Sequence, residues 1–145
     1  MRIRFYHILF ILFLITALHI SAILSGWYDV SIIWVDNIQH ILAGIALSIF
    51  FILIRRKKHD TSHISATQII LFVSLTSILW ELMEFFLLIF LHTYAKNFSL
   101  YSPTLIEALE DIISNLIGSI IFILINRNQK IDAPPHLKRC GLKGA

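Results

Sequence analysis

Three groups of residues in this 145-residue sequence combine carboxylate, imidazole and amide side chains at helical spacing. The members of each group are three or four residues apart, which places them on one face of an α-helix. Carboxylates and imidazoles are ligands of divalent cations and also the acids and bases of proton-transfer catalysis. The three groups are Asp36 and His40; Glu81 and Glu84; and Glu107, Asp111 and Asn115.

These side chains predict a catalytic or cation-binding site. Carboxylates crowded in a medium of low dielectric constant cannot all ionise, so the site requires a shared proton or a bound cation. The many oxygen ligands favour Mg²⁺ or Ca²⁺, whereas the imidazole of His40 also admits Zn²⁺ or Mn²⁺. The expected roles are catalytic for His40, Glu81 and Glu84, ligand-binding for Asp36, Glu107, Asp111 and Asn115, and metal-ligating for Asp36, His40, Glu84 and Asp111.

The segments that carry these groups are long and apolar. The chain is 57% hydrophobic and 14% charged, whereas a soluble domain has about 25% charged residues. About 20 residues of helix cross the hydrocarbon layer, and helices satisfy every backbone group there. The sequence predicts an all-α four-helix transmembrane bundle in one domain, residues 1–126, followed by a basic tail, residues 127–145. The predicted spans are about 5–25, 38–54, 67–92 and 104–125.

The positive charges indicate how the bundle is oriented. Eleven of the twelve Lys and Arg residues precede the first span, join the second to the third, or follow the fourth, and Lys96 alone lies on the other side. The positive-inside rule therefore predicts that both termini are cytoplasmic. Contact with anionic lipid headgroups explains these basic segments better than binding to nucleic acid does. Membrane lipids are the expected partners, and no nucleic acid is expected.

The first predicted span has a second interpretation. Arg2 and Arg4 precede an apolar core that ends near Ser21, Ala22 and Ser25, which loosely fits a cleaved signal peptide. The apolar region is longer than the usual 7–15 residues of such peptides, and no clean cleavage motif follows it. We therefore interpret residues 5–25 as a membrane span.

The three polar groups are predicted to lie at matching levels in the outer half of the membrane. At 1.5 Å per residue, Glu84 lies about 12 Å inside His92, and Asp111 lies about 10 Å inside Thr104. His40 lies about one helical turn inside its own boundary. The third span runs opposite to the second and fourth, so this agreement does not follow from the choice of span limits. The sequence predicts one shared polar site that opens to the outside.

Structural roles compete with the chemical ones. His40 is alternatively a buried histidine bonded to Asp36, and Asp36 alternatively caps the start of its helix. Asp111 and Asn115 alternatively supply hydrogen bonds between helices. Glu107 is alternatively a solvated residue near the membrane surface.

The polar motifs occur in a fixed order along the spans: Asp36, His40 and Gly44; then Trp80, Glu81 and Glu84; then Asp111, Asn115 and Gly118. This order over residues 35–125 resembles the small membrane proteins of the VanZ-like and YjdF-like group. The VanZ branch usually has a Lys after the first Asp and an Arg before the last motif. Here Asn37 follows Asp36, and no Arg lies between Arg56 and Arg127, so the YjdF-like branch fits better. The resemblance implies a bacterial inner-membrane protein. The two glycines are expected to allow close helix packing.

Three functional hypotheses follow. In the first, the outward-facing site binds or acts on a lipid-linked phosphate or another cell-envelope substrate, with a cation polarising the reacting oxygen. In the second, protons or cations are transported along a polar stripe on the third span, which requires a homo-oligomer because four helices form a thin transporter. In the third, the polar residues assemble a non-catalytic membrane subunit. The stripe comprises Ser74, Ser77, Glu81, Glu84 and His92.

Overall fold

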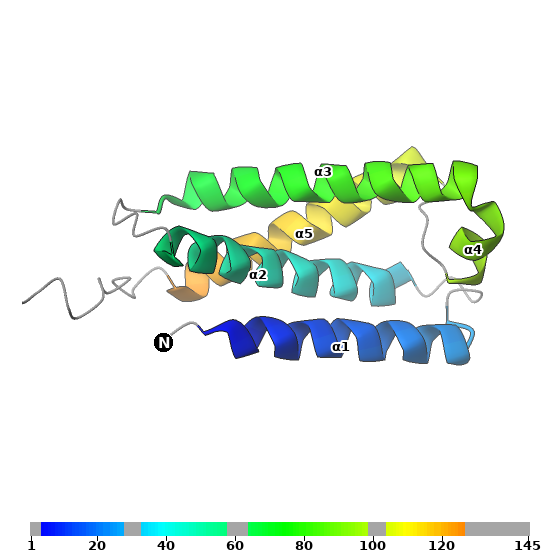
Figure 1. Cartoon of the computed structure of the whole chain (residues 1–145), viewed down its shortest axis with the longest axis horizontal. Coiled ribbons are helices and arrows are strands. Elements are labelled where there is room, and N and C mark those ends of the chain that lie inside the picture. The colour runs from blue at the N-terminus through cyan, green and yellow to red at the C-terminus, as the bar shows by residue number, and fades with distance from the viewer. Residues whose placement is uncertain (1–3, 28–32, 58–63, 99–103, 127–145) are drawn as a thin grey trace, which may run out of the picture.

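A computed structural model describes residues 4–27, 33–57, 64–98 and 104–126 of the chain. These residues form helices along the long axis of the molecule (Figure 1), and α1 and α3 lie on either side of α2. In the order of the chain the elements are α1 (Phe5–Leu24), α2 (Ile33–Lys57), α3 (Ala66–Phe90), α4 (His92–Asn97) and α5 (Leu105–Asn126). The predicted all-α fold is confirmed. The basic tail, residues 127–145, lies outside the described residues.

Two helix boundaries differ from the predicted spans. α2 begins at Ile33, five residues before the predicted start at residue 38. The predicted span counted only apolar residues, whereas a helix can include polar residues as long as its backbone groups are hydrogen-bonded. Asp36 therefore lies in the first turn of α2, where a carboxylate interacts favourably with the helix dipole. The predicted third span breaks at Leu91, whose backbone leaves the helical region (φ −131°, ψ 41°), and His92 begins the short α4.

Local hydrogen bonds define where α3 and α5 begin. The Ser65 hydroxyl accepts a hydrogen bond from the Gln68 N–H, and the Gln68 side chain accepts one from the Ser65 N–H. Thr104 and Glu107 make the same reciprocal pair before α5, at 3.2 and 3.0 Å. Such capping boxes satisfy N–H groups that have no partner within the helix.

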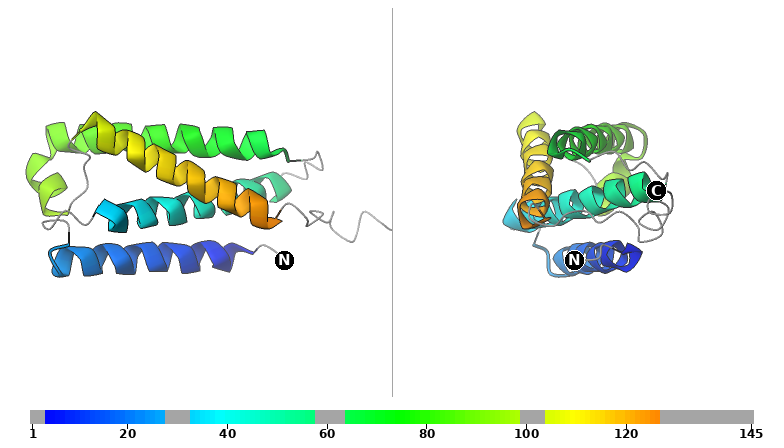
Figure 2. Two further views of the ribbon diagram at one scale, coloured as in Figure 1. Left: turned by 180° about the vertical axis from the view of Figure 1, so that it is seen from behind. Right: turned by 90° about the vertical axis from the view of Figure 1, so that its left-hand side faces the viewer.

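The helices alternate in direction up to α3, and α5 runs parallel to α2. The first and last described residues therefore lie at one end of the bundle, here called the terminal end, and α4 lies at the other, the α4 end (Figure 1). α5 crosses the bundle diagonally from α3 toward α2 (Figure 2), and α2 and α5 make the most extensive helix contact. Among the described helices, α2 is the one against which α1 packs.

Two glycines allow α2 and α5 to approach closely. A Cβ atom added at Gly44 would overlap the backbone carbonyl of Asn115, and one added at Gly118 would overlap the backbone carbonyl of Ile41. Each glycine thus packs against the backbone of the other helix. Small residues allow such backbone contact between membrane helices. The predicted packing role of both glycines is confirmed.

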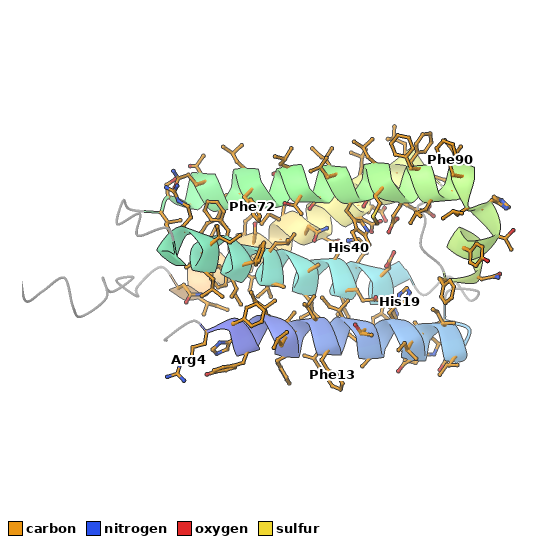
Figure 3. All side chains as sticks on the ribbon, in the orientation of Figure 1. Arg4, Phe13, His19, His40, Phe72 and Phe90 are labelled. Carbon is orange, nitrogen blue, oxygen red and sulfur yellow. The ribbon has the colours of Figure 1, made fainter. Side chains whose placement is uncertain are left out.

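The interior changes character along the bundle. Its apolar core lies toward the terminal end, and its members are Ile8, Ile49, Ile52, Ile69, Val73 and Phe122. Toward the α4 end many buried positions are polar, including Glu84, Asp111 and Asn115. The outer surface is largely apolar: Phe13 and Phe90 are 67% and 73% exposed and point away from the bundle (Figure 3).

Four helices of the described chain, α1, α2, α3 and α5, are long and apolar enough to cross a membrane. Apolar side chains outside and polar side chains inside suit a bundle surrounded by lipid, because lipid solvates apolar surface. The structure is thus consistent with a four-span membrane bundle. The first and last described residues lie on one side of such a bundle, and that this side is cytoplasmic stays a prediction.

Candidate metal centre

The contact between α2 and α5 brings two polar rows together. Asp36, His40 and Gly44 follow one another at four-residue intervals on α2, while Asp111 and Asn115 occupy the facing side of α5. α2 and α5 run in the same direction and touch at Gly44. Residues that lie one and two helical turns from this contact, toward the α4 end, therefore also face one another. In Figure 3 the His40 side chain lies on the side of α2 that faces α5.

Asp36, His40 and Asp111 form a compact group. The His40 Nε2 atom lies 3.6 Å from the Asp111 Oδ1 atom and 3.8 Å from the Asp36 Oδ1 atom. One potential ligand atom from each residue lies within 4.8 Å of the other two. The Asp36 side chain is 46% exposed, whereas those of His40 and Asp111 are 14% and 7% exposed. The group therefore opens at Asp36 and is closed at Asp111.

Asn115 holds the imidazole of His40 from the other side. Its Nδ2 atom donates to the Asp111 backbone carbonyl at 3.0 Å and also lies 3.0 Å from the His40 Nδ1 atom. Its Oδ1 atom is buried and has no hydrogen-bond partner among the described residues. A buried acceptor without a partner costs free energy, so this atom requires an explanation.

Glu84 extends the group from α3. Its side chain is buried and interacts electrostatically with His40, Asp111 and Asp36. The Trp80 indole N–H donates to its Oε1 atom at 2.6 Å, one helical turn away. Sequence reasoning assigned no role to Trp80, although its four-residue spacing from Glu84 carried that signal. Trp80 therefore orients the Glu84 carboxylate.

Replacing Trp80 by Phe is expected to lower the free energy of unfolding by about 1.5–3 kcal/mol, the usual contribution of a hydrogen bond to a charged group. Phe keeps an aromatic ring but lacks the N–H, so it leaves the buried Glu84 carboxylate without this donor. Unfolding in detergent measures the change. Trp34→Phe, at a 60% exposed position, is the matched control. An equal change in both variants would contradict the role of Trp80.

The helices supply almost no positive charge to this group. α1, α3 and α5 contain no Lys or Arg, those of α2 are confined to Arg55, Arg56 and Lys57 at its far end, and α4 contains Lys96. Arg55 follows His40 by fifteen residues, about 22 Å along a helix. Within the four long helices of the described chain, protons or a bound cation are thus the nearest groups that could balance this negative charge, because isolated charges are costly to bury.

The remaining predicted site residues have varied surroundings. The Glu107 carboxylate belongs to the capping box of α5, a role that its spacing from Thr104 could have revealed, and it also interacts electrostatically with Asp36. Glu81 is half-buried on α3, one turn from Glu84 toward the terminal end. His92 is exposed in α4. Among the described residues, the clustered ligand atoms come from Asp36, His40 and Asp111, and not from Glu81, Glu107 or the predicted ligand Glu84.

Two further contacts were not predicted from the sequence. The Ser114 hydroxyl donates to the Asn37 Oδ1 atom at 3.4 Å, adding a polar link between α5 and α2. The His19 Nε2 atom of α1 donates to the Phe98 carbonyl at 3.1 Å, and His19 interacts electrostatically with Asp36. All four membrane-crossing helices thus contribute titratable groups at the α4 end.

Comparison with known proteins gives one match. The family described as "Predicted membrane protein (DUF2238)" matches residues 1–130, which include all four membrane-crossing helices and every residue of the candidate metal centre. No curated protein and no solved structure matches the chain. The family description gives a membrane location and no activity, so a function must be argued from the geometry.

Proposed function

The chain belongs to the DUF2238 family of predicted membrane proteins, and we propose that Asp36, His40 and Asp111 bind a divalent cation inside its helical bundle. The bound cation serves a reaction or a binding step on a lipid-linked substrate that reaches the site from the α4 end. The VanZ-like and YjdF-like resemblance supports a cell-envelope substrate. The distances among the three side chains carry the proposal.

These distances suit ligands of one ion better than direct hydrogen bonds. The separations of 3.6 and 3.8 Å between His40 Nε2 and the two carboxylate oxygens exceed the usual limit of about 3.2 Å for N–H···O bonds. Two atoms that each bind an ion at about 2.1 Å lie at most about 4.2 Å apart. Small side-chain rotations would bring all three atoms, now within 4.8 Å of one another, onto one ion.

The ligand set favours Zn²⁺ or Mn²⁺. Two carboxylate oxygens and one imidazole nitrogen match the mixed sets of these ions, whereas Ca²⁺ takes six to eight oxygen ligands. Glu84 is the candidate for a fourth ligand or for a base, because it lies within electrostatic range of all three residues. If Glu84 acts as the base, the fourth coordination position of the cation is open on the exposed side, at Asp36. Water or substrate can then bind there, as in catalytic zinc sites.

The site can contribute to acyl or phosphoryl transfer in a defined way. A bound cation polarises a phosphoryl or ester oxygen. The Glu84 carboxylate, oriented by Trp80, is then the group placed to accept a proton. Because Asp36 is the most exposed member of the group, an amphiphile would place its polar part there and its chains along the apolar outer surface.

Removing the imidazole tests the cation site. In purified protein, His40→Gln is expected to weaken Zn²⁺ binding by at least about 100-fold, more than the loss of a group that only orients a ligand. Titration calorimetry and elemental analysis measure binding. His92→Gln, at an exposed position in α4, is the matched control and should bind like the wild type. Metal-free protein that processes a lipid-linked phosphate would contradict the proposal, and so would unchanged binding by His40→Gln.

The geometry gives the transport hypothesis less support. The Ser74 and Ser77 hydroxyls donate to the carbonyls of Ile70 and Val73 on their own helix. The interior then becomes apolar toward the terminal end. His92, the outer member of the predicted stripe, belongs to α4 rather than α3. Proton flux in liposomes that is abolished by Glu81→Gln would restore this hypothesis.

A further inference from the structure

We infer that Asn115 is a positioning residue that sets the tautomer of His40, and that its side-chain amide reverses when a cation binds. The inference rests on the proposed function, because it describes how the same site changes between its metal-free and metal-bound states. It is carried by two observations: the double contact of the Asn115 Nδ2 atom, and the buried Oδ1 atom that has no partner.

The orientation of the Asn115 amide follows from its contact with the backbone. Nδ2 lies 3.0 Å from the Asp111 carbonyl oxygen, which only accepts hydrogen bonds, so a donor must occupy this position. The same Nδ2 atom lies 3.0 Å from the His40 Nδ1 atom. Nδ1 is therefore an acceptor, and a neutral His40 carries its proton on Nε2, the atom that faces the two aspartates.

This tautomer cannot ligate a cation through Nε2. A ligating nitrogen needs its lone pair, and the other ring nitrogen then carries the proton and donates it to an acceptor. When His40 binds the cation, the ring loses a proton from Nε2 and gains one at Nδ1 through exchange with water. The number of protons on the ring does not change. The Nδ1–H group then faces the amide of Asn115 and needs an acceptor there.

The Oδ1 atom of Asn115 is that acceptor. Asn115 is only 4% exposed, and Oδ1 is buried without a hydrogen-bond partner in the metal-free arrangement. Reversing the amide places Oδ1 next to Nδ1–H and so gives it a partner. It also removes the Nδ2 contact with the Asp111 carbonyl. The amide orientation seen here thus suits the metal-free tautomer of His40, and cation binding, which moves the ring proton to Nδ1, favours the reversed one.

Nitrogen NMR on protein with ¹⁵N-labelled histidine tests this directly. The metal-free wild type should show His40 protonated on Nε2, and the Zn²⁺-bound protein should show it protonated on Nδ1. His40→Gln identifies the signal among the seven histidines. His40 protonated only on Nδ1 in the metal-free protein would overturn the inference, and so would Zn²⁺-bound protein that keeps the Nε2 proton.

Variants of Asn115 provide a second measurement, the tautomer of His40, which would not change if Asn115 had only a structural role. Asn115→Asp supplies an acceptor without a donor, so His40 should be protonated on Nδ1 before metal is added. Asn115→Ala removes both groups, and Zn²⁺ affinity should fall about 10–100-fold, as for other residues that orient metal ligands. Ser114→Ala, a buried neighbour that contacts Asn37, is the matched control and should leave the His40 tautomer unchanged.

The outcomes separate the two proposals. A wild type that binds no divalent cation defeats the proposed function, whatever the tautomer. A wild type that binds Zn²⁺ through His40, with the Nδ1 proton already present in the metal-free state, leaves the proposed function intact and defeats the amide reversal. Asn115→Ala protein that binds Zn²⁺ like the wild type also defeats it.

Discussion

Replacing Asp111 by Asn is expected to weaken Zn²⁺ binding by at least about 100-fold, because it removes one of two anionic ligands from a buried site. The Asp111 side chain is 7% exposed and lies 3.6 Å from the His40 Nε2 atom. Asn keeps the shape of the side chain but not its charge. Titration calorimetry with Zn²⁺ and Mn²⁺ on purified protein measures the loss.

The stability of the metal-free variant distinguishes loss of a ligand from loss of the fold. A neutral amide is cheaper to bury than a carboxylate, so metal-free Asp111→Asn should unfold at the same temperature as the wild type or at a higher one. Glu110→Gln makes the same chemical change at the adjacent, exposed position, and its Zn²⁺ affinity should match that of the wild type. Equal losses in the two variants would show that general electrostatics, rather than ligation, controls binding.

Replacing Gly118 by Ala is expected to destabilise the bundle by about 1–3 kcal/mol or more, the usual cost of overpacking. In an isolated helix Ala is more favourable than Gly by about 1 kcal/mol, so the sign of the change is diagnostic. The added Cβ would overlap the Ile41 carbonyl. Because that atom belongs to a helix backbone, α2 and α5 must move apart. Their separation would also move His40 away from Asp111, so Zn²⁺ affinity should fall with stability.

Unfolding in detergent and Zn²⁺ titration on the same preparation measure both effects. Gly44→Ala should lose stability and Zn²⁺ affinity as Gly118→Ala does, because its Cβ would overlap the Asn115 carbonyl. Ile117→Phe adds more volume next to Gly118 on the exposed side of α5 and is the control. A Gly118→Ala variant more stable than the wild type would show that the close contact between α2 and α5 is absent.

Much of the architecture could be predicted from local sequence. Four apolar segments of about the right length predict four membrane-crossing helices, because each helix in lipid satisfies its own backbone groups. The four-residue spacing of Asp36 and His40 predicts that both lie on one face of their helix, and they do. The boundary at Ile33 was missed because the apolar limit of a span and the start of a helix are different properties.

The site itself was only partly predictable. Equal depth along the spans indicated that Glu84, His40 and Asp111 belong together, because depth depends only on helical rise. The contact of Asn115 with the His40 imidazole fits the alternative in which Asn115 supplies a hydrogen bond between helices, but its partner was not predicted. The Trp80 hydrogen bond to Glu84 was also missed, although it joins residues of one helix, because Trp80 was considered only as part of the motif that carries the family resemblance.

The sequence by itself determined that the chain is a bundle of apolar helices with acids and histidines near one end, because hydrophobicity and helical period are properties of each segment alone. Only the tertiary structure decided which faces meet. The rotation of α2 and α5 about their axes depends on the fit of Gly44 and Gly118 against the opposite backbones, a long-range packing relation that no single helix encodes. That fit places Asp36, His40 and Asp111 within reach of one ion and turns separate polar residues into a site.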